Sequence, residues 1–270
     1  MSTRPFRAGV VGGPTRTGAA WLAWAARVEA AGYDTLLLPD TRHTPSPFPA
    51  LAAAAAVTST VRLGTWVLAS PLHHPAAVAR DTRALQLLSG DRFELGVGTG
   101  RPDAAAEAEQ LGLPWGSGGD RLRRLAEIVG AVRDQVDPAP PVLVAGAGPR
   151  VLTLAGGLAD TVALALHPTA TAGDVAQAAD LVRGNGDPEL ALSLSGVAGR
   201  LVTHLARAGM TAADCAGAAG VLDGDAAAMA AHLHELRERT GVSYLAVAAE
   251  QADAFAPVLA LLRADDPAVA

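Results

Sequence analysis

The sequence of 270 residues contains no lysine, so all 21 of its basic residues are arginines. Without a side-chain amine, the chain cannot form a Schiff base with a carbonyl substrate or with pyridoxal phosphate. A P-loop is excluded for the same reason, because that motif places a lysine on the phosphates. The only cysteine, Cys215, allows neither an internal disulfide nor a cysteine-rich metal site. A redox function would therefore depend on a bound cofactor.

Long apolar runs and basic clusters are also missing. Hydrophobic residues make up 50% of the chain, yet Arg, Asp, Pro or Gly interrupts every run before the ~18 residues that a membrane helix needs. The opening "MSTRPFRAGVVGG" has too short an apolar stretch for a signal peptide. The net charge of −6 argues against nucleic acids and anionic membranes as partners. We expect a cytoplasmic protein that acts on a small molecule.

The remaining pattern alternates short apolar runs with longer alanine-rich segments of helical period. Eight runs are expected to be strands, at residues 6–11, 34–39, 61–68, 92–98, 142–146, 161–166, 190–195 and 243–248. Strands joined by helices indicate a parallel sheet covered on both faces, and eight repeats in this length favour a (β/α)8 barrel. A doubly wound open sheet is the alternative, but "VVGGPTRTG" after the first strand lacks the dinucleotide spacing. We expect one domain over residues 1–270.

The stretch "DRFELGVGTGRPD", residues 91–103, ends a strand in three glycines at alternate positions. It is a poor dinucleotide fingerprint, because Arg101 stands where the third glycine belongs. In a barrel the glycines would let the backbone come close to a flat ligand. Close packing of strand and helix explains them equally well.

Longer stretches carry a family resemblance. The segment "RLGTWVLASPLHHPAAVARDTRALQLLSGDRFELGVGTG" (62–100) resembles the bacterial luciferase-like family of flavin and deazaflavin oxidoreductases. Weaker matches are "VEAAGYDTLLLPD" (28–40), "PPVLVAGAGPRVLTLAGGLAD" (140–160) and "HLHELRERTGVSYLAV" (232–247). Residues 167–230 match poorly. The resemblance is greatest to actinobacterial oxidoreductases that use the deazaflavin F420.

This resemblance implies a cofactor site. The family places its ring against the third strand, beside a non-prolyl cis peptide that would join Trp66 and Val67, and the ring pocket would include Gly98, Thr99 and Gly100. The cofactor phosphate would lie at "AGAGPR", which comprises Ala145, Gly146, Ala147, Gly148, Pro149 and Arg150. Small residues before a helix that starts at proline suit this use, since its N-terminus attracts anions. An unoccupied strand-to-helix turn is the alternative for this segment.

The chain departs from the family at its acid–base positions. Many deazaflavin-dependent members carry Asp-His after the second strand, whereas this sequence has Asp40-Thr41, and His43 is the nearest histidine. Sugar-phosphate dehydrogenases of the family place a glutamate after Gly-Thr-Gly, where this chain has Arg101. We therefore do not expect glucose phosphate oxidation. Arg101 suits the binding of a substrate carboxylate or phosphate but cannot act as a base.

The other histidines and the tryptophans give weaker signals. His232 and His234 lie two apart in a helical segment and therefore point apart, so we expect surface or packing histidines rather than metal ligands. His73 and His74 follow the third strand, with no carboxylate beside them in the sequence. Trp115 is expected in a loop over the active face.

Three functions remain open at this stage. The first is hydride transfer between F420 and a small organic substrate. The second is an FMN-dependent monooxygenase supplied with reduced flavin by a partner reductase. The third is a non-catalytic protein that binds a flavin-like ligand or a partner subunit. A homodimer is expected because it is usual in the family.

Overall fold

The computed structural model describes residues 4–13 and 15–265, which divide into two compact units. The first unit comprises residues 1–10, 147–157 and 162–270, and the second comprises residues 11–146 and 158–161. Across the described residues, no helix is both long and apolar enough to cross a membrane. The expected single domain over residues 1–270 stays a prediction.

The strand order identifies the fold class. The main sheet runs β3-β2-β1-β12-β8-β7-β6-β5-β4, and β3 also pairs with β5. Because β3 and β4 are two halves of one interrupted strand, this order closes eight strands into a (β/α)8 barrel, as expected. All eight predicted strands are present, in β1 (Arg7–Val11), β2 (Thr35–Leu38), β3 (Arg62–Thr65) with β4 (Leu68–Ala69), β5 (Phe93–Gly98), β6 (Val142–Gly146), β7 (Thr161–Leu164), β8 (Glu189–Ser193) and β12 (Val242–Ala248).

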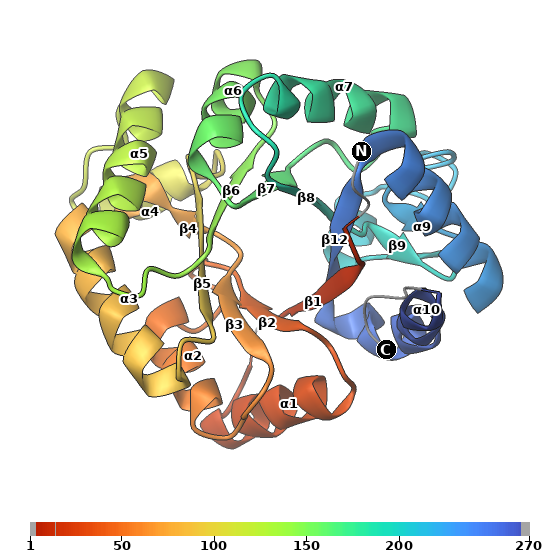
Figure 1. Ribbon diagram of the computed structural model, residues 1–270, viewed down its shortest axis with the longest axis horizontal. Coiled ribbons are helices and arrows are strands. Elements are labelled where there is room, and N and C mark those ends of the chain that lie inside the picture. The colour runs from red at the N-terminus through yellow and green to blue at the C-terminus, as the bar shows by residue number, and fades with distance from the viewer. Residues whose placement is uncertain (1–3, 14, 266–270) are drawn as a thin grey trace. The chain divides into compact units, whose positions relative to one another are not determined.

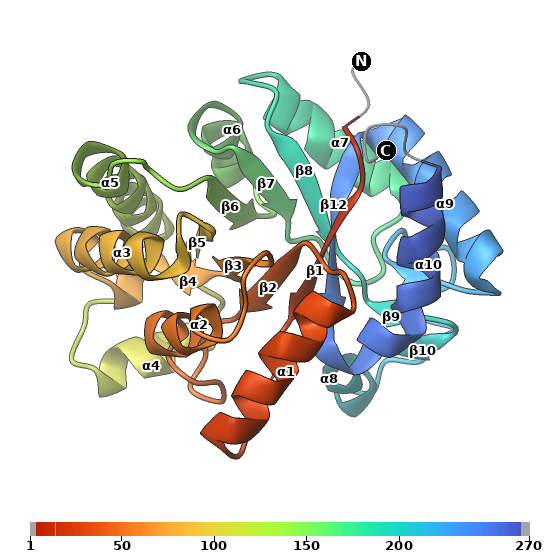
Figure 2. The ribbon, with the colours of Figure 1, turned by 60° about the horizontal axis from the view of Figure 1, so that its bottom comes forward.

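In the second unit, helices follow one another along the outside of strands β2, β3, β5 and β6 (Figures 1 and 2). They are α1 (Gly18–Ala30), α2 (Pro47–Ala55), α3 (Pro75–Ser89) and α5 (Gly118–Gln135), whereas α4 (Ala104–Gln110) contacts the short 3-10 helix η1 (Ser70–Leu72), which follows β4. Strands β2 and β5 are buried throughout, which explains their continuous apolar sequence. Because β2, β3, β4 and β5 pair in parallel, the segments after them emerge at one edge of the sheet.

A bulge interrupts the third strand at this edge. Leu63 pairs with Phe93 and Leu68 pairs with Val97. The third strand therefore contains one residue more than β5 between these two pairs. The Thr65 hydroxyl takes the place of the backbone hydrogen bonds that are missing at the bulge. It donates to the Gly96 carbonyl (2.7 Å) and accepts from the Gly96 N–H (2.8 Å). The apolar pattern predicted one continuous strand over residues 61–68, whereas the family resemblance implied a cis peptide between Trp66 and Val67, which is where the bulge lies.

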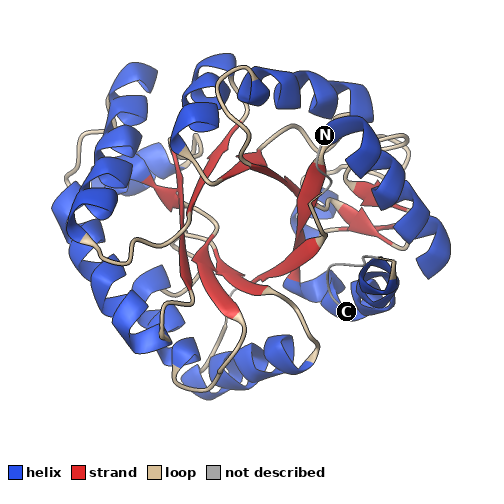
Figure 3. Cartoon of the chain, viewed as in Figure 1, coloured by secondary structure: helices blue, strands red, loops and turns tan. Residues whose placement is uncertain are grey.

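In the first unit, helices α7 (Ala172–Arg183), α9 (Ala226–Thr240) and α10 (Ala252–Ala264) lie outside strands β7, β8 and β12 (Figure 3). Helix α6 (Pro149–Leu158) follows β6, and η2 (Ala249–Gln251) precedes α10. Residues 196–222 add a small sheet of β9 (Gly196–Val197), β10 (Arg200–Leu201) and β11 (Val221–Leu222), with α8 (Thr203–Arg207). This sheet lies within the region 167–230 that the sequence patterns matched poorly.

Candidate functional site

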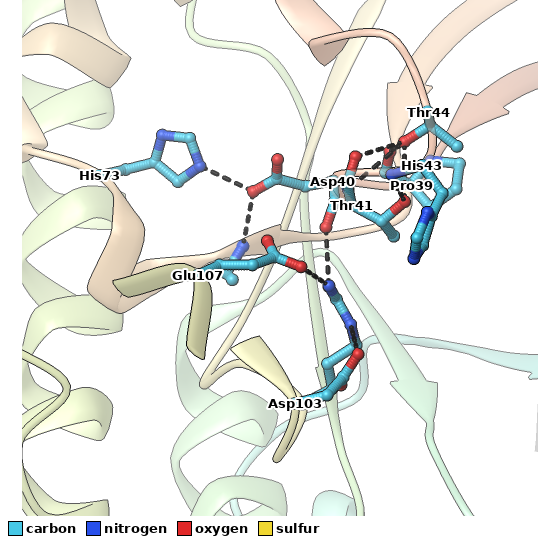
Figure 4. Close-up of polar contacts among 10 residues, drawn as sticks. Pro39, Asp40, Thr41, His43, Thr44, His73, Asp103 and Glu107 are labelled. Carbon is cyan, nitrogen blue, oxygen red and sulfur yellow. Dashed lines mark hydrogen bonds and ion pairs between the residues drawn. The ribbon is translucent and has the colours of Figure 1, made fainter. Parts of the chain in front are cut away.

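A carboxylate and a histidine meet where β2 and the third strand end. The Nε2 atom of His73 lies 2.7 Å from Oδ2 of Asp40 (Figure 4). The same Oδ2 accepts the backbone N–H of Ala69 (3.2 Å). The side chains are 26% and 16% exposed, so the pair is neither sealed off nor fully solvated. Such a pair fixes the orientation of the imidazole and can hold a proton on it.

The sequence reasoning missed this pair. It found no carboxylate beside His73, because Asp40 lies 33 positions away and approaches only through the parallel arrangement of β2 and β3. A usable signal was present nonetheless, since Asp40 and His73 each follow a predicted strand. The carboxyl ends of neighbouring parallel strands share one edge of a sheet.

Arg101 is held by groups of the chain itself, among them Asp103 and Glu107, which are labelled in Figure 4. Its guanidinium donates to the Asp40 carbonyl (2.8 Å) and to the Asp103 carboxylate (2.9 Å), and it forms an ion pair with Glu107. These contacts tie the loop after β5 to the loop after β2. The expected use of Arg101 on a substrate anion stays a prediction, and its three partners favour a positioning role instead.

His43 lies in a turn that follows Asp40. The Thr44 hydroxyl donates to the Pro39 carbonyl (2.8 Å), and the Thr41 hydroxyl accepts the His43 N–H (3.2 Å). The imidazole of His43 is exposed and is drawn apart from the Asp40–His73 pair (Figure 4). The expected role of His43 therefore stays a prediction, while His73 has the better-defined environment.

The residues expected to line a ring pocket lie at the same edge of the second unit. The peptide bond between Trp66 and Val67 is cis, as the resemblance implied. Trp66, Val67, Thr99 and Gly100 are all partly exposed, although the strands that lead to them are buried. The edge is therefore open where a flat ligand would contact it.

The three glycines in and just after β5 are needed for different structural reasons. A Cβ at Gly96 would lie 1.9 Å from the Thr65 carbonyl oxygen, and one at Gly98 would lie 2.9 Å from the Val67 side chain. Packing against the bulge therefore requires Gly96 and favours Gly98. Gly100 has a φ of +85°, and a Cβ there would lie 2.7 Å from the Trp115 ring. Trp115 thus covers the end of β5, in agreement with the expected loop over this face.

The segment expected to bind the cofactor phosphate is open. Ala147, Gly148, Pro149 and Arg150 are exposed, and α6 begins at Pro149. Beyond the two residues that adjoin Gly148, no described residue has an atom within 4 Å of a Cβ built there, so space remains above this turn. The first backbone N–H groups of a helix lack intrahelical acceptors, and the turn can therefore accept an anion.

The remaining histidines of the sequence reasoning pack as expected. His232 Nε2 lies 3.1 Å from the Ala219 carbonyl oxygen. The ring of His234 packs edge-on against Phe6 at 5.3 Å, and its Nδ1 lies 3.2 Å from the guanidinium of Arg237. In the part of the chain that the structure describes, no group of three His, Cys, Asp or Glu residues could hold a metal ion.

Known proteins resemble the chain in sequence. A relative from Beutenbergia cavernae, an F420-dependent glucose-6-phosphate dehydrogenase, is 34% identical over 171 residues, which cover 52% of this chain and 50% of that protein. A 4-hydroxyprotoasukamycin monooxygenase from Streptomyces nodosus subsp. asukaensis is 35% identical over 121 residues, which cover 44% of this chain and 29% of that protein. The chain thus spans half or less of the length of these relatives.

The fold has solved counterparts. An F420-dependent secondary alcohol dehydrogenase, solved with an F420-acetone adduct, superposes with a TM-score of 0.76 at 18% identity, over 99% of this chain and 100% of that one. At this identity the likeness concerns the fold. The family model described as luciferase-like monooxygenase matches residues 3–199, which is most of the sequence. The chain therefore belongs to the luciferase-like monooxygenase family.

Proposed function

We propose that this protein is an oxidoreductase that uses F420 for hydride transfer to or from a small organic substrate. Family membership and relatives that are named as F420-dependent enzymes support this proposal. The observation that carries it is the Asp40–His73 pair, which lies beside the residues expected at the cofactor ring.

The pair supplies the acid–base group that the sequence lacks after β2. The histidine that follows the aspartate in many F420-dependent members is replaced by Thr41, and His73, which follows η1, faces the aspartate instead. Hydride transfer to a C=C, C=N or C=O bond also requires a proton, and a positioned histidine can deliver or accept it. Asp40 would orient His73 by accepting a hydrogen bond from its Nε2–H.

The chain offers residues that fit the cofactor. Trp66, Val67, Gly98, Thr99 and Gly100 would face the ring, because this edge of the sheet is open at most of them. The turn of Ala145, Gly146, Ala147, Gly148 and Arg150 would hold the phosphate, because Gly148 leaves free space and the helix N-terminus attracts an anion. When bound, F420 supplies a carbon centre that donates or accepts a hydride.

The Arg101 contacts argue against oxidation of a sugar phosphate. The sugar-phosphate dehydrogenases that the sequence resembles have a glutamate at this position, and Arg101 is neutralised by Asp103 and Glu107. Although a relative is a glucose-6-phosphate dehydrogenase, we infer a different substrate for this chain. The substrate is a small molecule, and we keep a homodimer and a cytoplasmic location as predictions.

An FMN-dependent monooxygenase is the second candidate. The relative from Streptomyces nodosus, named as a monooxygenase, favours it. FMN carries a ring and a phosphate like those of F420, so the same residues would serve both. This function would require a reductase partner to supply reduced flavin. A non-catalytic role is less well supported, because the Asp40–His73 pair replaces the acid–base group whose loss suggested it.

Titration of the purified protein with F420, FMN and reduced FMN tests the proposal. Absorbance and fluorescence of each cofactor report binding. Micromolar affinity for F420 alone supports hydride transfer through F420, and a preference for reduced FMN selects the monooxygenase. Failure to bind any of the three would overturn both enzymatic functions and favour the non-catalytic one.

A further inference from the structure

A hollow lies within the second unit, next to the Asp40–His73 pair. It has a volume of about 420 Å³ and opens between the segment after β4 and the loop that leads into α5. Its lining includes His73, Leu113, Trp115, Asp120, Arg121 and Arg124. Of these residues, the sequence patterns had indicated only Trp115, in a loop over the active face, and His73, as one of the weaker signals.

The charges around this hollow leave one cation without a carboxylate. Ser117 donates its N–H and its hydroxyl to Asp120 (2.8 and 2.7 Å), which also pairs with Arg123. Arg124 lies 3.2 Å from the Glu127 carboxylate. Arg121, by contrast, has no carboxylate within ion-pair distance among the described residues.

The Arg121 guanidinium is held in place although it lacks a counter-ion. It lies 4.6 Å from the centre of the Trp115 ring, and one of its NH groups donates to the Gly116 carbonyl (3.0 Å). Its Nε atom is buried and has no hydrogen-bond partner among the described residues. An anion in the hollow would accept charge-assisted hydrogen bonds from the terminal N–H groups of this guanidinium and supply the missing counter-ion.

Apolar side chains line another part of the hollow. Trp115 presents a flat ring, Leu113 is a 38% exposed large hydrophobic side chain, and Pro71 also lines the hollow. His73 also lines the hollow, and its Nδ1 atom is the ring nitrogen turned away from Asp40 (Figure 4). A ligand here would therefore contact a cation, an aromatic surface and an imidazole nitrogen.

We propose that this hollow binds an organic anion, a carboxylate attached to a flat apolar body, as the substrate of the proposed oxidoreductase. The Arg121 guanidinium binds the carboxylate, Trp115 stacks on the apolar body, and His73 faces the part of the molecule that gains or loses a proton. The assignment rests on the proposed function for its role in catalysis, but binding of the anion can be measured without any cofactor.

The test compares 1-naphthoate with 1-naphthamide, which has the same shape and no charge. Isothermal titration of the cofactor-free protein measures both, so a failure here is separate from a failure to bind F420. We expect naphthoate to bind more tightly than naphthamide. The variant Arg121→Gln should weaken naphthoate by about tenfold or more, because a charge-assisted hydrogen bond is lost. Naphthamide binding should hardly change.

Controls keep the result interpretable. Arg121→Lys retains the charge and should keep part of the naphthoate affinity. Arg80→Gln removes an arginine that is 73% exposed on α3, and it should leave both affinities unchanged. If Arg121→Gln lowers the thermal midpoint, Arg124→Gln provides the second test, because it removes a rim cation without touching Trp115. A smaller loss of naphthoate affinity is expected for it.

Two outcomes overturn the proposal. One is equal binding of the two probes with no effect of either arginine variant. The other is competition between F420 and naphthoate together with weaker F420 binding by Arg121→Gln. That result would assign the cation to the carboxylated tail of the cofactor rather than to a substrate.

Discussion

Asp40 and His73 form a hydrogen-bonded pair, with 2.7 Å between Oδ2 and Nε2, although they lie 33 positions apart. Each residue follows a parallel strand, and the Ala69 N–H and the Arg101 guanidinium hold Asp40 in place. A neutral imidazole carries its proton on only one nitrogen. The carboxylate therefore selects the tautomer with hydrogen on Nε2 and leaves the Nδ1 lone pair free.

The first prediction concerns this tautomer. Nitrogen-15 NMR of the labelled protein, above the pH at which the imidazole becomes neutral, should show the proton of His73 on Nε2. Asp40→Asn should weaken that preference, because a neutral amide can either donate or accept. His74→Ala, which removes the neighbouring exposed ring, should leave the His73 signals unchanged. A His73 proton on Nδ1 in the wild-type protein would contradict the pair as described.

The second prediction concerns catalysis, once a substrate is in hand. His73→Ala should lower turnover by about 100- to 10,000-fold, the usual contribution of a positioned acid or base. Added imidazole should restore part of the activity if the ring moves a proton, and it should not do so if His73 is only structural. His43→Ala serves as the matched control, and an equally large loss in that variant would move the role to His43.

The third prediction concerns the turn before α6. Gly148→Val should weaken F420 binding by at least about tenfold, because the side chain fills the space where the phosphate accepts backbone N–H groups. Thermal stability should stay close to wild type, since no described residue beyond the two adjoining ones has an atom within 4 Å of the new Cβ. Gly130→Val, at an equally open glycine in α5, is the control and should bind F420 normally. Unchanged affinity in Gly148→Val would place the phosphate elsewhere.

The fourth prediction concerns the bulge in the third strand. Gly96→Ala should destabilise the fold by at least about 2 kcal/mol, because its Cβ would lie 1.9 Å from the Thr65 carbonyl oxygen and the backbone must shift. Gly130→Ala, which meets no atom within 4 Å and removes a helix glycine, should be neutral or slightly stabilising. Urea unfolding of both variants measures the difference, and equal midpoints would show that the strands adjust freely.

The fifth prediction concerns stability in acid. Burial opposes the ionisation of Glu29, but N–H groups of Thr60, Val61 and Ser59 and the Thr60 hydroxyl donate to it, and together they lower its pKa from 4.5 to about 2. A carboxyl with a lower pKa in the folded state stabilises the fold fully above pH 4.5, and this contribution disappears as the pH falls towards 2.

Glu29→Gln should therefore cost about 1 kcal/mol at neutral pH, an amount reduced by solvent screening. In this variant the free energy of unfolding should also decrease less between pH 4.5 and pH 2 than it does in the wild-type protein. Urea unfolding at several pH values compares it with Glu235→Gln, which removes an exposed helix carboxylate that lies 3.5 Å from Arg239. An acid slope that is the same in both variants would contradict the importance of the Glu29 contacts.

The sequence alone predicted the strands and the fold class, because apolar runs and helical period are local properties. The resemblance carried by "GTWVLASPLHHPAAVARD" implied a cis peptide between Trp66 and Val67, and the structure has it. Boundaries differ by a residue or two, except where the bulge splits the third strand after Thr65.

Only the tertiary structure decided which side chains meet. Residues 40 and 73 face each other because β2 and β3 pair in register, with Leu38 beside Thr65, and no spacing within either segment encodes that contact. In the same way, Arg101 looked free in sequence and proved to be bound by Asp103 and Glu107, while Arg121 lies over Trp115 without a counter-ion among the described residues. A sequence records the charge of each side chain, but the partners that neutralise that charge are chosen by packing between strands and loops that are distant along the chain.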